Sequence, residues 1–411
     1  MTVVQGLIGW GALLALAWSL SESRRTIPWR IVTGGVVLQI ALALLLIGVP
    51  QARAAILLLN GAVDALQRAT DDGTGFLFGY LGGGALPFVE TRPGASLILA
   101  FKILPLVLVI SAIGSLLFHW GVMQRIAAVF AFVLRRAVGI DGPVALAAAV
   151  HIFVGNIEAP LLIRPYLMGL QRGELFAVLS CGMAGIAGTV MVIYAAILGP
   201  IIPDALGTII TASVISTPAA LAVSALMVPF TPALGHTAAA ADRPRALSSL
   251  DALVRGTADG IGPLVGITTT LLVAVTLVSL ANIALSHLPG APTLEGVFAI
   301  PFRPVLWLMG VPWAETPAAG LLMGTKTVLN EFVAYLHLAA LPPADLSAHS
   351  RVILTYAMCG FANFGSVGIM VGGMGAMVPE RRAEIAVLGL RSIVSGTIAT
   401  CMSGALAGAL T

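Results

Sequence analysis

The hexapeptide Gly155-Asn156-Ile157-Glu158-Ala159-Pro160 places a carboxylate beside a carboxamide, within sequence apolar enough to lie in a lipid bilayer. A second stretch of the same kind is Leu329-Asn330-Glu331-Phe332-Val333-Ala334-Tyr335. Ionisable side chains are costly in hydrocarbon, so those found within membrane segments mark functional sites by default. These two stretches, the first and second Asn/Glu motifs, therefore predict where the chemistry of this chain is located.

The composition identifies the class of protein. Of 411 residues, 58% are hydrophobic and 9% are charged, and the mean hydropathy is +1.02. Soluble proteins contain about 25% charged residues. Abundant Gly and Ala among runs of Leu, Val and Ile favour closely packed helices over a β-barrel. We therefore expect a polytopic helical protein in a lipid bilayer, and the small net charge of +3 predicts no nucleic-acid partner.

Eight apolar segments are predicted to cross the membrane, and the first of them is expected to be a retained helix, not a cleaved signal peptide. Two further segments, 51–92 and 119–137, are amphipathic and are predicted to lie at the interface. The glycine cluster from Gly79 to Gly84 should end the first of them. The predicted spans are 3–20, 30–49, 97–118, 176–198, 205–230, 261–285, 352–378 and 383–410.

The arginines predict how the chain is threaded, because basic residues accumulate on the cytoplasmic side. The chain contains four groups of arginines. All four lie on the cytoplasmic side only if one segment in 141–172 and one in 291–346 enter and leave the membrane on the same face. Both Asn/Glu motifs then lie in re-entrant hairpins, and both termini are extracytoplasmic. Prolines at 301, 304, 312 and 317 also exclude one straight helix over 291–346. The arginine groups are Arg24, Arg25 and Arg30; Arg125, Arg135 and Arg136; Arg243, Arg245 and Arg255; and Arg381 and Arg382.

A weak internal repeat connects the two motifs. Each motif precedes a helix interrupted by glycine, and Glu158 and Glu331 stand in front of Gly185 and Gly360 at similar distances. Since the two hairpins enter from opposite faces, the repeat is inverted. Inverted repeats whose broken helices meet at mid-membrane are typical of secondary transporters. The predicted fold class is an all-α polytopic membrane protein with eight transmembrane helices, two opposed re-entrant hairpins and interfacial helices.

The sequences of three segments resemble motifs of the concentrative nucleoside transporters, and they occur in the same order as in that family. The first hairpin motif is Gly155-Asn156-Ile157-Glu158-Ala159-Pro160-Leu161-Leu162-Ile163-Arg164-Pro165-Tyr166, and the second is Asn330-Glu331-Phe332-Val333-Ala334-Tyr335. The broken helix is Cys359-Gly360-Phe361-Ala362-Asn363-Phe364-Gly365-Ser366. The resemblance covers residues 1–411. It implies a homotrimer that imports nucleosides against a gradient, coupled to sodium or protons.

The resemblance also implies roles for individual residues. Glu331, Asn363 and Ser366 would hold the ribose hydroxyls, and an ionised carboxylate suits a vicinal diol because it accepts charge-assisted hydrogen bonds. Phe361 would pack on the nucleoside. Where the family has Gln-Thr-Glu facing the base, this chain has Asn156, Ile157 and Glu158, with Val190 as the apolar wall. The expected ribose site is therefore intact, whereas the base site differs.

The coupling-ion region differs from the family pattern as well. The resemblance places His151, Val154, Gly185 and Ile186 there, with His151 and Gly185 in place of an Asn and a Ser that bind sodium. Sodium prefers oxygen ligands, whereas a histidine takes up a proton near neutral pH. We therefore favour H⁺ over Na⁺, with sodium near Val154 and Ile186 as the alternative. No cofactor and no other metal site are predicted.

Two other functions remain open from the sequence. The altered first hairpin is compatible with a transporter of nucleobases or another ribosylated compound. An intramembrane enzyme would use His151 and Glu158 as base and acid, since residues seven apart share a helix face. No nucleophile or metal motif supports an enzyme. The prediction is therefore a nucleoside symporter of the inner membrane and not an enzyme.

The predicted domain organisation follows from these segments. Residues 1–92 and 93–140 are expected to be scaffold. Residues 141–235 form the first repeat of the transport unit, 236–260 a cytoplasmic linker, and 261–411 the second repeat.

Overall fold

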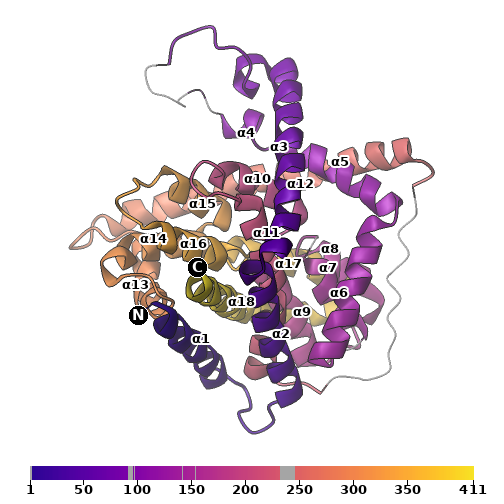
Figure 1. The fold of residues 1–411 in the computed structure, drawn as a ribbon, viewed down its shortest axis with the longest axis vertical. Coiled ribbons are helices and arrows are strands. Elements are labelled where there is room, and N and C mark those ends of the chain that lie inside the picture. Colours follow the sequence, from indigo (N-terminus) through magenta and orange to yellow (C-terminus); the bar gives the residue numbers. More distant parts are fainter. Residues whose placement is uncertain (1, 91–95, 97, 141, 153, 232–245) are drawn as a thin grey trace.

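The computed structural model describes residues 2–90, 96, 98–140, 142–152, 154–231 and 246–411, and every regular element among them is a helix (Figure 1). Five segments are long and apolar enough to cross a bilayer: 29–48, 99–119, 205–227, 249–285 and 379–410. The expected all-helical membrane fold with several apolar spans is confirmed. The helices are α1 (Thr2–Ser19), α2 (Trp29–Gly48), α3 (Pro50–Phe78), η1 (Gly79–Gly82), α4 (Leu99–Lys102), α5 (Leu106–His119), α6 (Val122–Val138), α7 (Gly142–His151), α8 (Glu158–Leu162), η2 (Arg164–Tyr166), α9 (Arg172–Ala184), α10 (Gly188–Leu198), α11 (Ala205–Met227), α12 (Ser249–Leu285), α13 (Leu294–Leu308), η3 (Trp313–Glu315), α14 (Thr316–Val328), α15 (Glu331–Ala340), α16 (Ala348–Met358), α17 (Phe364–Met377), η4 (Pro379–Arg381) and α18 (Arg382–Leu410).

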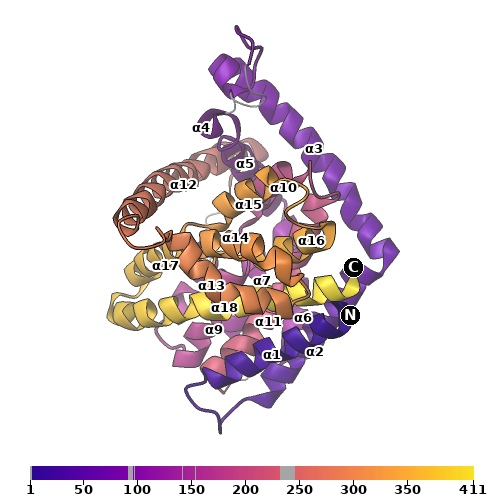
Figure 2. The same ribbon diagram turned by 90° about the vertical axis from the view of Figure 1, so that its left-hand side faces the viewer.

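Helices α11 and α18 form the centre of the molecule, and α1 and α2 pack directly on them (Figure 2). A buried chain of polar side chains joins all four helices. Trp10 donates to Gln39 at 3.2 Å, Gln39 donates to Ser403 at 3.3 Å, and the hydroxyls of Ser403 and Ser216 are 2.8 Å apart. Polar side chains that bond across helices hold them together in lipid, where burial of apolar surface supplies no driving force. The first two helices are thus fixed to this central pair.

The two Asn/Glu motifs lie at turns between short helices. Helix α7 ends at His151 and α8 begins at Glu158, and the pair α14 and α15 is separated only by Leu329 and Asn330. In each case the two helices pack against each other across the turn. The proline-rich segment 291–346 is broken as expected: Pro312 lies in the break after α13 and Pro317 in the first turn of α14, whereas Pro301 and Pro304 lie inside α13.

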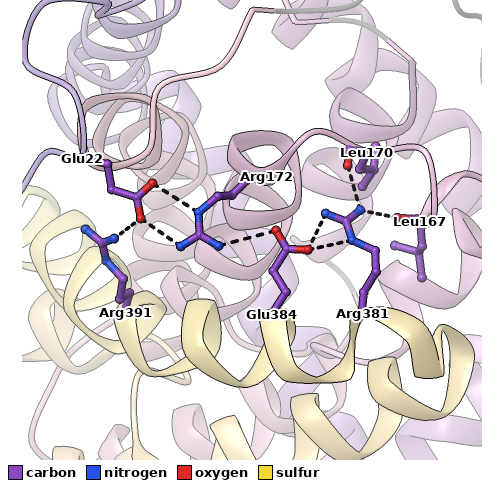
Figure 3. A network of polar contacts seen from close by, with 7 residues as sticks. All are labelled: Glu22, Leu167, Leu170, Arg172, Arg381, Glu384 and Arg391. Atoms are coloured by element: carbon purple, nitrogen blue, oxygen red, sulfur yellow. Dashed lines mark hydrogen bonds and ion pairs between the residues drawn. The ribbon is translucent and has the colours of Figure 1, made fainter.

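An arginine fixes the chain that follows each turn. Arg351, only 7% exposed, donates to the carbonyl oxygens of Leu338, Leu341, Pro342 and Leu346 at 2.9–3.2 Å, after the second turn. After the first turn, Arg381 donates to the carbonyl oxygens of Leu167 and Leu170, both at 2.7 Å (Figure 3). A guanidinium carries five donors in a rigid fork, so one side chain can satisfy several free carbonyls.

The two helices that follow the turns are broken, as the glycines predict, and they cross at their breaks. Helix α9 stops at Ala184 and continues as α10, and α16 stops at Met358 and continues as α17. The Phe361 amide donates to the Gly185 carbonyl at 3.1 Å. A methyl group on Gly360 would lie 2.7 Å from the Met183 carbonyl oxygen. The two backbones therefore touch at a point where no side chain fits.

Replacing Gly360 by alanine should lower the melting temperature of the purified protein, because the new methyl group overlaps the backbone of α9. Overpacking of this kind costs about 1–3 kcal/mol. Gly368→Ala is the matched control, since its methyl group would meet nothing within 4 Å inside helix α17. Alanine there should be neutral or stabilising by about 0.5 kcal/mol. Equal melting temperatures for the two variants would contradict the close crossing.

Helices α5 and α12 form a separate pair. Methyl groups on Gly256 and Gly260 would lie 2.5 Å and 2.9 Å from the Cβ atoms of Ser115 and Ser111, which is the close packing of a G-x-x-x-G pair. Helix α12 begins at Ser249, so 249–260 of the expected linker are helical, while 232–245 lie outside the described residues. Along α12, 6% of the spanning window is buried, in contrast to 94% for α11. The α5–α12 pair thus lies at the periphery.

The packing also shows which connections share a side. A methyl group on Gly6 would lie 3.4 Å from Ala409, so the two ends of the chain lie together (Figure 2). At the opposite end of α1, the Glu22 carboxylate accepts hydrogen bonds from Arg172 at 2.9 Å and from Arg391. Arg172 also lies 3.5 Å from Glu384, which bonds Arg381 at 2.9 Å (Figure 3). The connection α1–α2, the start of α9 and the start of α18 therefore lie together at one end of the molecule.

Glu22→Gln should lower the melting temperature at pH 7, by the equivalent of less than about 1 kcal/mol for a partly exposed ion pair. The Arg172 hydrogen bond and the charges of Arg172 and Arg391 hold the pKa of the Glu22 carboxyl below its usual value. Because this pKa is lower in the folded state, the ionised carboxylate stabilises the fold at pH values above the unfolded-state pKa of about 4.3. This stabilisation is lost as the pH falls further. The difference from wild type should therefore be smaller at about pH 3.5 than at pH 7.

The control is Glu380→Gln, an exposed carboxylate at the same end of the molecule. It should leave the melting temperature unchanged at both pH values. A Glu22→Gln difference of the same size at both pH values would mean that packing, not charge, stabilises this contact.

Candidate functional site

Two asparagines organise the second hairpin and the second broken helix. The side-chain oxygen of Asn330 accepts from the Val333 amide at 3.0 Å and caps α15. That of Asn363 accepts from the Ser366 amide at 2.7 Å and caps α17. An N-cap asparagine satisfies an amide that the helix leaves free, which explains why both helices begin where the sequence reads Asn. The positive ends of both helix dipoles point into the protein interior here.

Glu331 lies in the first turn of α15 and is 3% exposed. Its two carboxylate oxygens accept from the Tyr194 hydroxyl at 2.7 Å and from the Asn363 side-chain amide at 3.0 Å. A carboxylate has about four lone-pair positions, so acceptor capacity is left for a ligand. The structure thus brings Glu331, Asn363 and, through its backbone amide, Ser366 together, as the resemblance implied.

Tyr194 is a contact that the sequence reasoning missed. It lies on α10, one helical turn after Val190, so both residues share the face of α10 that meets Glu331. Its ring is 5.1 Å from that of Tyr335 and 6.1 Å from that of Phe332. The sequence contained one signal for this contact: Tyr194 follows the predicted wall residue Val190 by four residues, which places both on one face of a helix. Helix α10 therefore contributes a hydrogen-bond donor to the acid at the start of α15.

Lys326 is fully buried on α14, and its ammonium group bonds to α16 and α18. It donates to the Ala357 carbonyl at 3.1 Å and to the Thr400 hydroxyl at 3.5 Å. Ala357 lies in the last turn of α16, where carbonyl groups lack helical partners. Lys326 therefore stabilises the end of α16, directly before the break.

The first hairpin meets the second broken helix from the other side. Ile157 packs on α17, where a methyl group on Gly373 would lie 3.0 Å from its side chain. The Glu158 carboxylate folds over Gly155, and Asn156 is 9% exposed beside Gly182. Phe361 is partly buried and Val190 is 7% exposed. The predicted base-side residues Asn156 and Ile157 thus contact the two broken helices, at Gly182 and Gly373.

The predicted ion region lies where α7 meets the end of α9. One ring nitrogen of His151 bonds to the backbone of Val178, and Nε2 is buried without a partner. The ring contacts Gly182, and the carbonyl oxygen of His151 would lie 3.6 Å from a methyl group on Gly185. Ile186 is fully buried, and the Val154 amide donates to Val150. The structure therefore places His151 beside Gly185.

The observed helices correct one premise of the enzyme alternative. His151 ends α7 and Glu158 begins α8, so the two side chains do not share one helix face. Within the described part of the chain, no ion pair joins Glu158 or Glu331 to an arginine. The same residues contain no cluster of three or more metal-binding side chains.

Three family models match the chain. The "Na⁺ dependent nucleoside transporter" models match residues 8–81 at the N-terminus and 208–408 at the C-terminus, and a "Nucleoside recognition" gate model matches 100–201. An uncharacterized transporter of Haemophilus influenzae is 35% identical over 422 residues, covering 99% of this chain and 98% of that protein. Together these matches cover nearly the whole chain.

Solved structures agree over the whole chain. CNTnw in an inward-facing, substrate-bound state matches with a TM-score of 0.91 and 34% identity, covering 100% of this chain and 98% of that one. A CNTnw variant in an outward-facing state matches with a TM-score of 0.89 and 33% identity, over the same shares. The two broken helices that meet at Gly185 and Phe361, the buried contact of Glu331 with Asn363, and these matches have one explanation: the chain belongs to the concentrative nucleoside transporters, a family of cation-coupled membrane transporters and not of enzymes.

Proposed function

We propose that this chain is a symporter that imports nucleosides across the inner membrane by alternating access, driven by a cation gradient. The observation that carries the proposal is the Glu331 carboxylate, buried at the crossing of the two broken helices and bonded to Asn363 and Tyr194. A buried acid with spare acceptor positions at the N-termini of two helices suits the vicinal hydroxyls of ribose.

The remaining site residues divide between the two ends of a nucleoside. Glu331, Asn363 and Ser366 hold the ribose, and Phe361 packs on the ligand. Asn156, Ile157, Glu158 and Val190 face the base. The asparagine is one methylene shorter than the family glutamine and the isoleucine lacks a hydroxyl, so the base is held by fewer polar contacts. This difference supports the second candidate, a transporter of nucleobases or another ribosylated compound.

A binding panel separates the two candidates. Melting temperatures of the detergent-solubilised protein are measured with nucleosides and with the corresponding free bases. Stabilisation by nucleosides alone supports the ribose site, since a ligand that binds only the folded state raises its stability. Stabilisation by free bases to the same extent would favour the nucleobase transporter.

For the movement, we propose that the hairpins and broken helices form the mobile transport unit, and that the remaining helices frame it. The peripheral α5–α12 pair is suited to such a frame because its main contact is internal to the pair. Eight segments then cross the membrane fully, and both termini are extracytoplasmic. The cytoplasmic face carries the arginines around Glu22.

For the coupling ion, we favour H⁺ over Na⁺. His151 replaces an amide oxygen with an imidazole whose Nε2 has no protein partner, and Gly185 has no hydroxyl. The experiment is uptake of labelled uridine or adenosine into proteoliposomes, with an inward Na⁺ gradient in one arm and an inward H⁺ gradient in the other. Accumulation driven by the pH gradient is the expected result. Strict dependence on sodium, with no response to pH, would refute proton coupling.

We also propose a homotrimer. Helix α12 exposes a long apolar side, with Leu272 70% and Leu280 61% exposed, and methyl groups on Gly262 and Gly266 would meet nothing within 4 Å. Small residues on an exposed apolar helix favour helix association in membranes. Light scattering of the detergent complex should give three times the mass of one chain.

A further inference from the structure

Ser213 is a deeply buried polar side chain that no contact among the described residues explains. It lies on α11, is 0% exposed, and its hydroxyl has no hydrogen-bond partner. A buried hydroxyl without a partner loses its hydration without compensation. The other nearby side chain with an unpartnered buried atom is His151, on α7. Both lie beside the last turn of α9, at Gly185 and Gly182 respectively.

The missing side chain of Gly185 leaves a space bordered by oxygen atoms. A methyl group there would lie 3.4 Å from the Ser213 hydroxyl, 3.6 Å from the His151 carbonyl oxygen and 3.7 Å from the Cys181 carbonyl oxygen. Cys181 is in the final turn of α9, where carbonyls have lost their helical partners. Three oxygens from three helices therefore surround one small space, directly at a helix break.

We propose that Ser213 is a ligand of the coupling cation. In this chain the hydroxyl ligand then comes from Ser213 on α11, because Gly185, at the break between α9 and α10, has no hydroxyl. Unwound carbonyls and the C-terminal ends of half-helices bind coupling cations in secondary transporters. Here the carbonyls of His151 and Cys181 supply two oxygens and Ser213 the third. The ligand is a small monovalent cation, sodium or a hydrated proton. The inference rests on the proposed coupling of transport to a cation.

The geometry also indicates a second substitution that should restore the cation site. Gly185 has φ −116° and ψ 176°, an extended conformation that any residue adopts, and a methyl group there makes only ordinary contacts. A serine at 185 would therefore place its hydroxyl in the space that Ser213 borders. Gly185→Ser should restore a cation site that Ser213→Ala has damaged.

The test uses proteoliposomes containing wild type, Ser213→Ala, Ser213→Ala with Gly185→Ser, and Ser224→Ala. Ser224 is the control, since it is a buried serine of the same helix whose hydroxyl only bonds back to Leu221 at 3.0 Å. Labelled nucleoside uptake is measured against Na⁺ concentration at fixed pH, and against external pH without Na⁺. Counterflow with equal, saturating cation on both sides measures nucleoside movement without the gradient.

Ser213→Ala should raise the half-saturating cation concentration about ten-fold, the loss of one oxygen ligand, while counterflow stays near wild type. The double variant should recover, and Ser224→Ala should match wild type. The arm that responds identifies the cation as sodium or the proton. Unchanged cation dependence in Ser213→Ala, or a loss that Gly185→Ser does not restore, would overturn the assignment of Ser213. A wild type that moves nucleoside but never accumulates it would instead overturn the coupling itself.

Discussion

Glu331→Gln should weaken nucleoside binding by about 10- to 100-fold, since a hydrogen bond to a charged group contributes about 1.5–3 kcal/mol. The substitution keeps the size and shape of the side chain but removes the charge and replaces an acceptor with a donor. The new amide would also face the side-chain amide of Asn363, which now donates to Glu331 at 3.0 Å. Equilibrium binding of labelled nucleoside to the purified protein measures the loss.

Tyr194→Phe is the matched control for this prediction. It removes the hydroxyl that donates to Glu331 at 2.7 Å but leaves the carboxylate and the ring contact with Tyr335 in place. The expected loss is smaller, about 1 kcal/mol or five-fold. Wild-type binding by Glu331→Gln would refute the assignment of Glu331 to the ribose.

Asn363→Asp should abolish detectable binding at neutral pH while leaving the fold intact. Aspartate caps a helix as well as asparagine does, so the bond to the Ser366 amide at 2.7 Å is retained. In the wild-type protein the side-chain nitrogen of Asn363 donates to Glu331. In the variant, a second carboxylate oxygen would face Glu331 in its place. Two carboxylates at this separation cannot both be ionised. Binding should therefore fall by at least about 100-fold with little change in melting temperature.

Asn363→Ser separates the two roles of this residue. Serine also caps a helix, but it introduces no charge against Glu331. We expect it to bind nucleoside more tightly than Asn363→Asp, at a similar melting temperature. A large drop in melting temperature for both variants, with equal binding, would show that Asn363 only caps α17.

Much of the fold was predictable because the bilayer restricts what a chain can do. Charged residues locate the connections, and glycines locate the helix breaks, so the breaks at Gly185 and Gly360 could be predicted from the sequence. The start of α12 did not, since Ser249 to Gly260 look like a polar linker. In the structure, Ser248 caps this segment and Gly256 packs closely on Ser115, so it is continuous with the helix. Pro301 and Pro304 within α13 were likewise not foreseen.

The site was predictable where helix starts carry chemistry. Asn330 and Asn363 cap their helices and thereby fix the position of Glu331, which is a local property of the sequence. Contacts between repeats depend on how the broken helices cross, and no local pattern encodes that. Tyr194 reaches Glu331 and Ser213 reaches Gly185 only through this crossing. Ser213 was therefore visible only in three dimensions, whereas the sequence offered one signal for Tyr194, its spacing of four residues after Val190.

The most direct test of the central claim measures binding of a nucleoside and of its 2′- and 3′-deoxy analogues to wild type and Glu331→Gln. If Glu331 holds the ribose, removing a ribose hydroxyl weakens binding to wild type by about ten-fold but has little further effect in Glu331→Gln, because the two partners are coupled. Equal losses in both proteins, or no loss in wild type, would contradict ribose recognition at Glu331.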